Sequence, residues 1–112
     1  METILESFSR HVAEAPERIA FAHGDTLLTF GELDRRSMHV AAGLAEAGVE
    51  RGMPVGILVT QGMLFPIALI ALWRLGAIVV PFDPAAPPED RAARESIVDL
   101  AFMIADSGVA LS

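Results

Sequence analysis

The stretch that decides the fold is Ala71-Leu72-Trp73-Arg74-Leu75-Gly76-Ala77-Ile78-Val79-Val80-Pro81-Phe82-Asp83-Pro84. Its first part has helical composition, and Gly76 stands where a helix ends, because glycine takes the left-handed C-cap conformation without steric cost. The β-branched run that follows predicts a short strand, and the two prolines stop that strand in a rigid turn. A helix that passes through one glycine into an apolar strand is typical of an α/β protein.

The segment upstream completes a strand–helix–strand unit. Residues 54–60 form a nearly continuous apolar run, which predicts a strand buried on both faces of a parallel sheet. The helix that follows is apolar nearly all round and ends at Leu75, so the order predicts a right-handed βαβ unit. Pro66 falls in the first turn of this helix and removes a backbone hydrogen bond unless the helix begins at about Phe65.

The first third of the chain predicts a helix and a hairpin. Ile4, Leu5, Phe8 and Val12 recur at helical spacing, which predicts an amphipathic helix over residues 3–15 that ends at Pro16. Two short apolar runs, residues 19–22 and 26–28, flank His23-Gly24-Asp25 and predict a hairpin whose turn uses Gly24 at positive φ.

A second helix begins at a recognisable cap. Thr29 and Glu32 have the spacing of a capping box, in which each side chain hydrogen-bonds to the backbone of the other. The helix should run to about Ala47 and end at Gly48. Its predicted buried stripe consists of Leu33, Val40, Ala41 and Leu44.

The last part of the chain predicts a loop, a helix and a strand. Residues 81–88 contain four prolines and predict a rigid loop. A helical pattern then extends from Glu89 to Asp106, and Ser107-Gly108 should end it. A further strand begins at Val109 and would lie at an exposed sheet edge.

Composition excludes several classes of function. The 112 residues suit one domain, and a net charge of −7 argues against binding nucleic acid. There is no cysteine, and all eight cationic side chains are arginine, so neither a thiolate site nor a lysine-bearing phosphate loop is present. The acidic N-terminus is unlike a secretory signal, which predicts a cytoplasmic protein.

Six features invite a functional interpretation and also have a structural one. The apolar stretch 55–82 resembles a membrane span only if Gln61, Gly62, Pro66 and Arg74 are disregarded, and the Gly76 stop favours a buried core. His11, His23 and His39 lack the spacing of a metal pair, which favours surface histidines.

The acidic residues and the remaining candidates follow the same logic. Glu89, Asp90, Glu95 and Asp99 are interleaved with Arg91 and Arg94, which favours a solvated helix face over paired catalytic carboxylates. Ser107 lacks the surroundings of a nucleophilic serine. Gly62 follows a strand at the edge where open sheets bind ligands, a weak signal, and Asp83 between two prolines suits a turn.

The ordered set of motifs resembles the opening of the AMP-forming adenylating enzymes, above all the adenylation domains of nonribosomal peptide synthetases. Thr29-Phe30-Gly31-Glu32-Leu33 is similar to the first core motif of that family, and residues 72–84 are similar to the second. Residues 15–20, 47–55 and 100–108 resemble the connecting segments, so the likeness covers nearly the whole chain. It departs from the family at Ala92 to Asp99, which add about two helical turns.

The resemblance implies a partial α/β fold, a short hairpin plus βαβ units with a mostly parallel sheet. Complete relatives convert a carboxylic acid and ATP, with Mg²⁺, into an acyl-adenylate and pass the acyl group to a thiol, typically on a carrier protein. Their phosphate loop, ribose-binding acid and catalytic lysine lie in later segments. No catalytic, cofactor-binding or metal-binding residue is therefore carried over to this chain.

Two functions remain open on sequence alone. The first is a single truncated N-terminal subdomain, residues 1–112, that is inactive without the remainder of an adenylation domain. The second is a non-catalytic interaction module that completes or caps a partner, or associates with itself, because a shortened sheet leaves an edge open. Neither function predicts a nucleic-acid or membrane partner.

Overall fold

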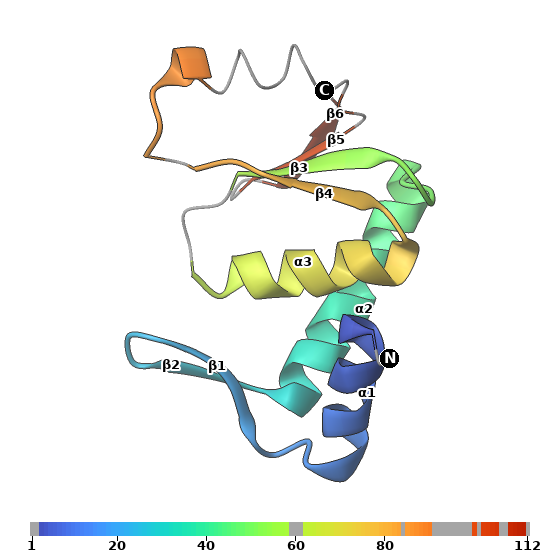
Figure 1. The fold of residues 1–112 in the computed structure, drawn as a ribbon, viewed down its shortest axis with the longest axis vertical. Helices are drawn as coiled ribbons and strands as arrows, with labels where there is room; N and C mark the ends of the chain where they lie inside the picture. Colours follow the sequence, from blue (N-terminus) through green and yellow to red (C-terminus); the bar gives the residue numbers. More distant parts are fainter. Residues whose placement is uncertain are drawn as a thin grey trace.

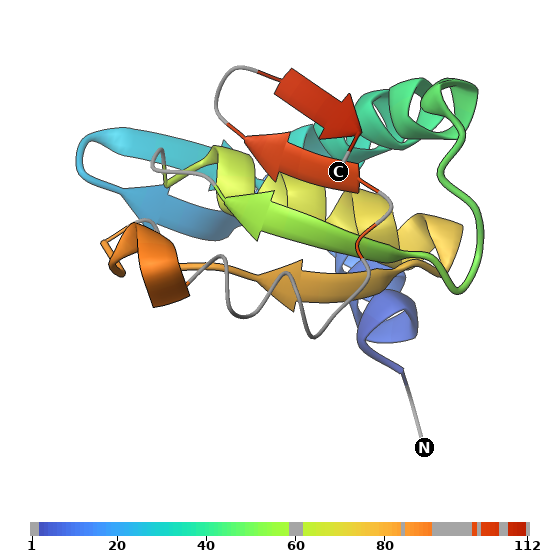
Figure 2. The same cartoon turned by 90° about the horizontal axis from the view of Figure 1, so that it is seen from above.

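Four strands form the sheet on which the chain is built, in the order β4-β3-β5-β6. β3 (Pro54–Leu58) lies between β4 (Ile78–Pro81) and β5 (Phe102–Ala105) and pairs with both in parallel. β6 (Gly108–Leu111) pairs antiparallel with β5 and forms one edge of the sheet (Figure 2). The structure is a computed structural model and describes residues 3–58, 62–83, 85–90, 100, 102–105 and 108–111.

Helices cover one face of this sheet. α2 (Phe30–Ala47) and α3 (Leu64–Leu75) pack against each other, and α3 connects β3 to β4 (Figure 1). α1 (Ile4–Glu14) and the hairpin of β1 (Ile19–His23) and β2 (Thr26–Thr29) lie on the side of the helices away from the sheet. The predicted α/β class and the strand–helix–strand unit are confirmed.

The core follows these layers. Between the sheet and the helices lies the largest cluster, with Val55, Ile57, Phe102 and Ile104 from the strands and Ala41, Leu44, Ala68 and Leu72 from the helices. A second cluster joins α1 and the hairpin to the helices through Phe8, Leu28, Leu33, Ile67 and Ile70. A third covers the opposite face of the sheet, where Val80, Phe82 and Leu100 are buried.

The predicted caps at both ends of α2, the glycine that ends α3 and the hairpin turn at Gly24 are confirmed. The Glu32 N–H donates to the Thr29 hydroxyl and the Thr29 N–H donates to the Glu32 carboxylate, each at 3.1 Å. Gly24 in the hairpin turn has φ 60°, and the helix-ending Gly48 and Gly76 have φ 110° and 73°. Of the predicted stripe on α2, Leu33, Ala41 and Leu44 are buried and Val40 is half-buried.

The predicted helix over residues 89–106 is wrong at its C-terminal end. Residues 102–105 form β5, and the Gly108 that was expected to end the helix begins β6. Phe102 and Ile104 face the helices, whereas Met103 packs on the opposite face, so the segment has the two-residue period of a strand. A short apolar run fits either period, and the buried second edge of β3 needs backbone partners, which decides for the strand.

Two other expectations concern the ends of elements. α3 begins at Leu64 rather than Phe65, which puts Pro66 in its third position. The first four N–H groups of a helix have no partner within it, so Pro66 removes no hydrogen bond and the predicted cost is absent. Residues 59 and 60 of the predicted strand, and the additional residues Ala92 to Asp99, lie outside the described residues.

The membrane span that the sequence disfavours would require a long apolar helix. None of those in the described part of the chain combines the length and apolarity needed to cross a bilayer.

Candidate functional site

The carboxyl ends of the parallel strands mark the edge where open α/β sheets bind ligands. β3 ends there at Leu58, β4 at Pro81 and β5 at Ala105. Gly62 belongs to the connection from β3 to α3, and the segment around Asp83 follows β4. Of these two positions, the sequence placed Gly62 at this edge as a weak ligand signal and assigned Asp83 to a turn.

The hairpin tip is packed against the Gly62 connection. A Cβ atom built on Gly62 would lie 2.5 Å from Cγ of the His23 ring and 2.6 Å from its Nδ1, so any side chain at this position would displace the imidazole. The absence of a side chain at Gly62 thus allows the imidazole to lie on the backbone. The sequence treated His23 as a surface histidine and Gly62 as a weak ligand signal; the two are neighbours, and no local pattern links them.

Asp83 stabilises a turn, as predicted. Its carboxylate oxygen Oδ1 accepts a hydrogen bond from the Ala85 N–H at 2.9 Å, and its carbonyl accepts one from the Ala86 N–H at 3.1 Å. The Phe82 N–H donates to the Ile57 carbonyl at 2.9 Å and anchors the start of this turn to β3. The Asp83 side chain is exposed, and its hydrogen bond serves the loop after β4.

The other histidines are not arranged for metal binding. The Nδ1 atom of His11 lies 2.7 Å from the Ser7 carbonyl, and its ring stacks on Phe30 with centroids 5.1 Å apart. His11 is therefore partly buried rather than a surface residue, whereas His39 on α2 is exposed. Among the described residues no group of three His, Cys, Asp or Glu side chains could hold an ion.

The acidic cluster is only partly described. Glu89 and Asp90 are exposed, whereas Glu95, Asp99, Arg91, Arg94 and Ser107 lie outside the described residues. The predicted solvated helix face stays a prediction, whereas the helix end assigned to Ser107 is wrong, because residues 102–105 form β5.

Arg74 holds three helices together, which the sequence did not reveal. Its guanidinium forms an ion pair with the carboxylate of Asp34 on α2, and its Nε donates to the Ser37 hydroxyl at 3.2 Å. The same guanidinium lies 5.8 Å from the centroid of the Phe8 ring on α1. Ser37 is fully buried and donates to the Asp34 carbonyl at 3.0 Å, so its hydroxyl both donates and accepts a hydrogen bond. The local signal for this contact was the spacing of Asp34 and Ser37 along α2. Their partner Arg74 lies 40 residues after Asp34 and 37 residues after Ser37.

Hydrogen bonds and close packing also fix the N-terminus of α2. The Gly31 N–H donates to the Pro16 carbonyl at 2.9 Å, and a Cβ on Gly31 would lie only 3.2 Å from that oxygen. The hydrogen bonds that Glu32 receives from Thr29 hold the pKa of its carboxyl below the ordinary value, and Arg36 and Arg35 act in the same direction. The first motif thus closes a backbone joint between the chain entering the hairpin and α2.

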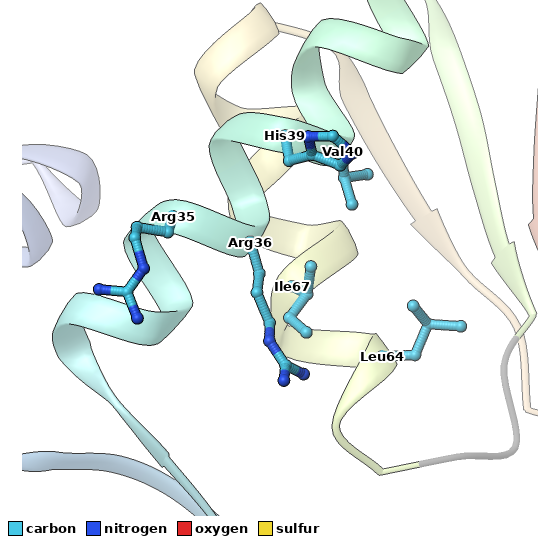
Figure 3. A pocket seen from close by; sticks show the side chains of 6 residues that line it. All are labelled: Arg35, Arg36, His39, Val40, Leu64 and Ile67. Carbon is cyan, nitrogen blue, oxygen red and sulfur yellow. The ribbon is translucent and has the colours of Figure 1, made fainter.

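An open hollow of about 310 Å³ lies between α2 and α3 (Figure 3). We call it the α2–α3 hollow. Its lining residues are Arg35, Arg36, His39 and Val40 from α2 and Leu64 and Ile67 from α3. Figure 3 shows the Arg36 side chain running beside Ile67, whereas the Arg35 side chain points away from Ile67 and Leu64; His39 and Val40 lie further along the same helix.

Comparisons with known proteins all indicate one protein family. A family model described as AMP-binding enzyme matches residues 8–111. One component of the linear gramicidin synthase of Brevibacillus parabrevis is 37% identical over 110 residues, which is 98% of this chain and 1% of that protein. Malpibaldin synthetase of Mortierella alpina is 34% identical over 110 residues, 98% of this chain and 2% of the relative. The chain therefore spans only a few hundredths of the length of these curated relatives.

Solved structures give the same fold. The N-terminal subdomain of Klebsiella oxytoca NpsA superposes with a TM-score of 0.88 at 22% identity, covering 99% of this chain and 29% of that one. O-succinylbenzoate coenzyme A synthetase of Bacillus subtilis superposes with a TM-score of 0.82 at 27% identity, covering 89% and 22%. An artificially fused adenylation–PCP di-domain from Klebsiella oxytoca is a further match, with a TM-score of 0.89 at 23% identity, covering 95% of this chain and 20% of that one.

Proposed function

Because the chain belongs to the family of AMP-binding enzymes, we propose that it supplies the N-terminal framework of an adenylation unit that activates a carboxylic or amino acid for thioester formation. The observation that carries the proposal is the match of residues 8–111, in order, to the family model. Relatives named linear gramicidin synthase and malpibaldin synthetase align with almost the whole chain and support a peptide-synthetase type of unit.

In the proposed reaction a carboxylate oxygen of the acid attacks the α-phosphorus of ATP, pyrophosphate leaves, and a thiol later takes the acyl group from AMP. The carrier protein of such a unit is the expected thiol partner. We propose that the nucleotide and Mg²⁺ bind to residues of the remainder of the unit. The sequence contains no lysine, and the described residues offer no cluster of three metal ligands.

The contribution of this chain is therefore structural. The turn held by Asp83 and the joint at Gly31 fix the backbone on either side of α2 and α3. The parallel strands end at one edge, the edge at which open α/β sheets bind ligands. We propose that the isolated 112 residues are inactive and that the protein works in the cytoplasm.

The experiment that tests this function is ATP–pyrophosphate exchange with a panel of amino and aryl acids. The purified chain should show no exchange above background. A chimera, in which the chain replaces the matching segment of a peptide synthetase adenylation unit, should retain exchange. Turnover by the isolated chain refutes its inactivity, and a soluble, folded chimera without exchange refutes the framework role.

The open edges of the sheet favour a second candidate function, a non-catalytic module that completes a partner. β6 and β4 are the outer strands of the described sheet, and Ile78 on β4 is 55% exposed. Unpaired strand edges with apolar side chains favour pairing with another chain. This candidate predicts self-association or a stable complex with the rest of an adenylation unit. Sedimentation of a monodisperse monomer at micromolar concentration, with no binding of a hydrophobic dye, argues against it.

A further inference from the structure

We propose that the α2–α3 hollow is a docking site for an acidic amphipathic helix of a neighbouring domain or protein. The inference goes beyond the adenylation role, because it concerns a groove between two helices rather than the ends of the strands. Its basis is the shape of the hollow, the charges around it and the direction of the two helices that form it.

The shape of the hollow favours a large occupant. It is open to solvent along one side, and its floor consists of the apolar side chains of Val40, Leu64 and Ile67. Small-molecule sites enclose most of their ligand, whereas this hollow leaves one flank uncovered. An occupant that extends beyond the hollow and places one or two apolar anchors in it gains the burial that a small ligand would lack.

Charge selects an acidic occupant. The chain carries a net charge of −7, yet its two adjacent arginines, Arg35 and Arg36, both line this hollow together with His39. Within the described part of the chain the Arg36 guanidinium makes no hydrogen bond or ion pair; it acts on the Glu32 carboxyl through its charge alone, and that carboxyl is hydrogen-bonded to Thr29. A guanidinium group without a hydrogen-bond partner, beside an apolar floor, is complementary to a carboxylate that flanks apolar side chains.

The two walls point to a helix as the occupant. On α2, Arg36 lies one turn before His39 and Val40. On α3, Leu64 lies one turn before Ile67. A third helix laid in the groove between them would present side chains at the same spacing, which is the helix-in-groove mode of recognition. The relatives supply neighbouring protein, because this chain is only a small part of each.

The test uses the 112-residue chain and a fluorescent peptide of roughly four helical turns, with leucines one turn apart and glutamates beside them. Binding is followed by fluorescence anisotropy up to about 1 mM, the range of weak contacts. We expect saturable binding of this acidic peptide, with amide shifts confined to the residues of the hollow. A peptide with lysine in place of each glutamate should bind at least about tenfold more weakly. Octanoate, a small apolar anion, should not compete at equal concentration.

Two arginine variants separate the hollow from general electrostatics. Arg36→Gln should weaken binding of the acidic peptide about threefold to fivefold, as the loss of one partly screened charge contact predicts. Arg10→Gln removes the same charge from α1, outside the hollow, and should leave the affinity unchanged. Circular dichroism of each variant confirms that it is folded.

Three results would overturn the proposal. They are no saturable binding of the acidic peptide, equal affinity for the lysine peptide, and equal losses in the two arginine variants. Competition by octanoate at equal concentration would instead assign the hollow to a small anion. None of these measurements depends on exchange activity, so a failure here leaves the adenylation proposal intact.

Discussion

Arg74 is the position where one substitution should test the helical packing most directly. Arg74→Met keeps most of the side-chain volume but removes the ion pair to Asp34, the hydrogen bond to Ser37 and the contact with the Phe8 ring. The two charged side chains of the pair are 24% and 27% exposed, which places it between surface and buried ion pairs. The pair is therefore worth about 1.5 kcal/mol.

The other two contacts add to this value. The hydrogen bond to Ser37 contributes about 0.5 kcal/mol, since the buried hydroxyl keeps its bond to the Asp34 carbonyl. The cation–π contact adds about 0.5 kcal/mol. We expect a total loss of about 2.5 kcal/mol in the free energy of unfolding, which lowers Tm by roughly 10 °C in a domain of this size.

Urea unfolding followed by circular dichroism measures this loss, with Arg10→Met as the matched control. Arg10 and Glu14 are 3.8 Å apart with side chains 46% and 65% exposed, so the loss of this ion pair in the control should cost less than about 0.5 kcal/mol. In an Asp34→Asn background the effect of Arg74→Met should fall by about half, because the ion pair is already lost. A loss below about 0.5 kcal/mol for Arg74→Met would show that the three-helix contact contributes nothing to stability.

Three further predictions concern the cap of α2 and the hairpin contact. Thr29→Ala should lower the free energy of unfolding by about 1 kcal/mol in urea unfolding, whereas Thr29→Ser, which keeps the capping oxygen, should cost little. Because the folded-state pKa of Glu32 is lowered, its stabilising contribution is present above the unfolded-state pKa and is lost as pH falls through the lowered one. Glu32→Gln should therefore reduce the loss of Tm on acidification. Gly62→Ala should displace the imidazole and shift the His23 ring resonances in NMR spectra with little change in Tm, because the clash is with the end of an exposed side chain that can move away.

The parts of the fold that sequence predicted are those governed by local rules. The capping box at Thr29, the left-handed Gly76 and the turn at Asp83 each depend on a few neighbouring residues, and all three are confirmed. The start of α3 was off by one residue because several apolar positions there are equally helical.

The errors and omissions involve contacts between distant segments. Residues 102–105 became a strand because β3 offers a buried edge, a fact no local period contains. The packing of His23 on Gly62 and of Arg74 on Asp34 joins segments almost forty residues apart or more. Local patterns in a single sequence carry no information about such distant pairs. They therefore could not predict candidate sites that depend on those contacts.

The residues that carry the family likeness meet backbone requirements, and this has a consequence for specificity. A Cβ on Gly31 would press on the Pro16 carbonyl, and Gly76 sits at φ 73° with the Arg51 side chain 3.2 Å from the position of a Cβ. Asp83 holds its own turn. If the remainder of the unit reads the acid, then a chimera that carries this chain should keep the acid preference of the recipient enzyme in ATP–pyrophosphate exchange. Its rate should fall wherever the new joint fits imperfectly. A changed ranking of acids at similar stability would show that these residues take part in selecting the substrate, and that the framework role is too narrow.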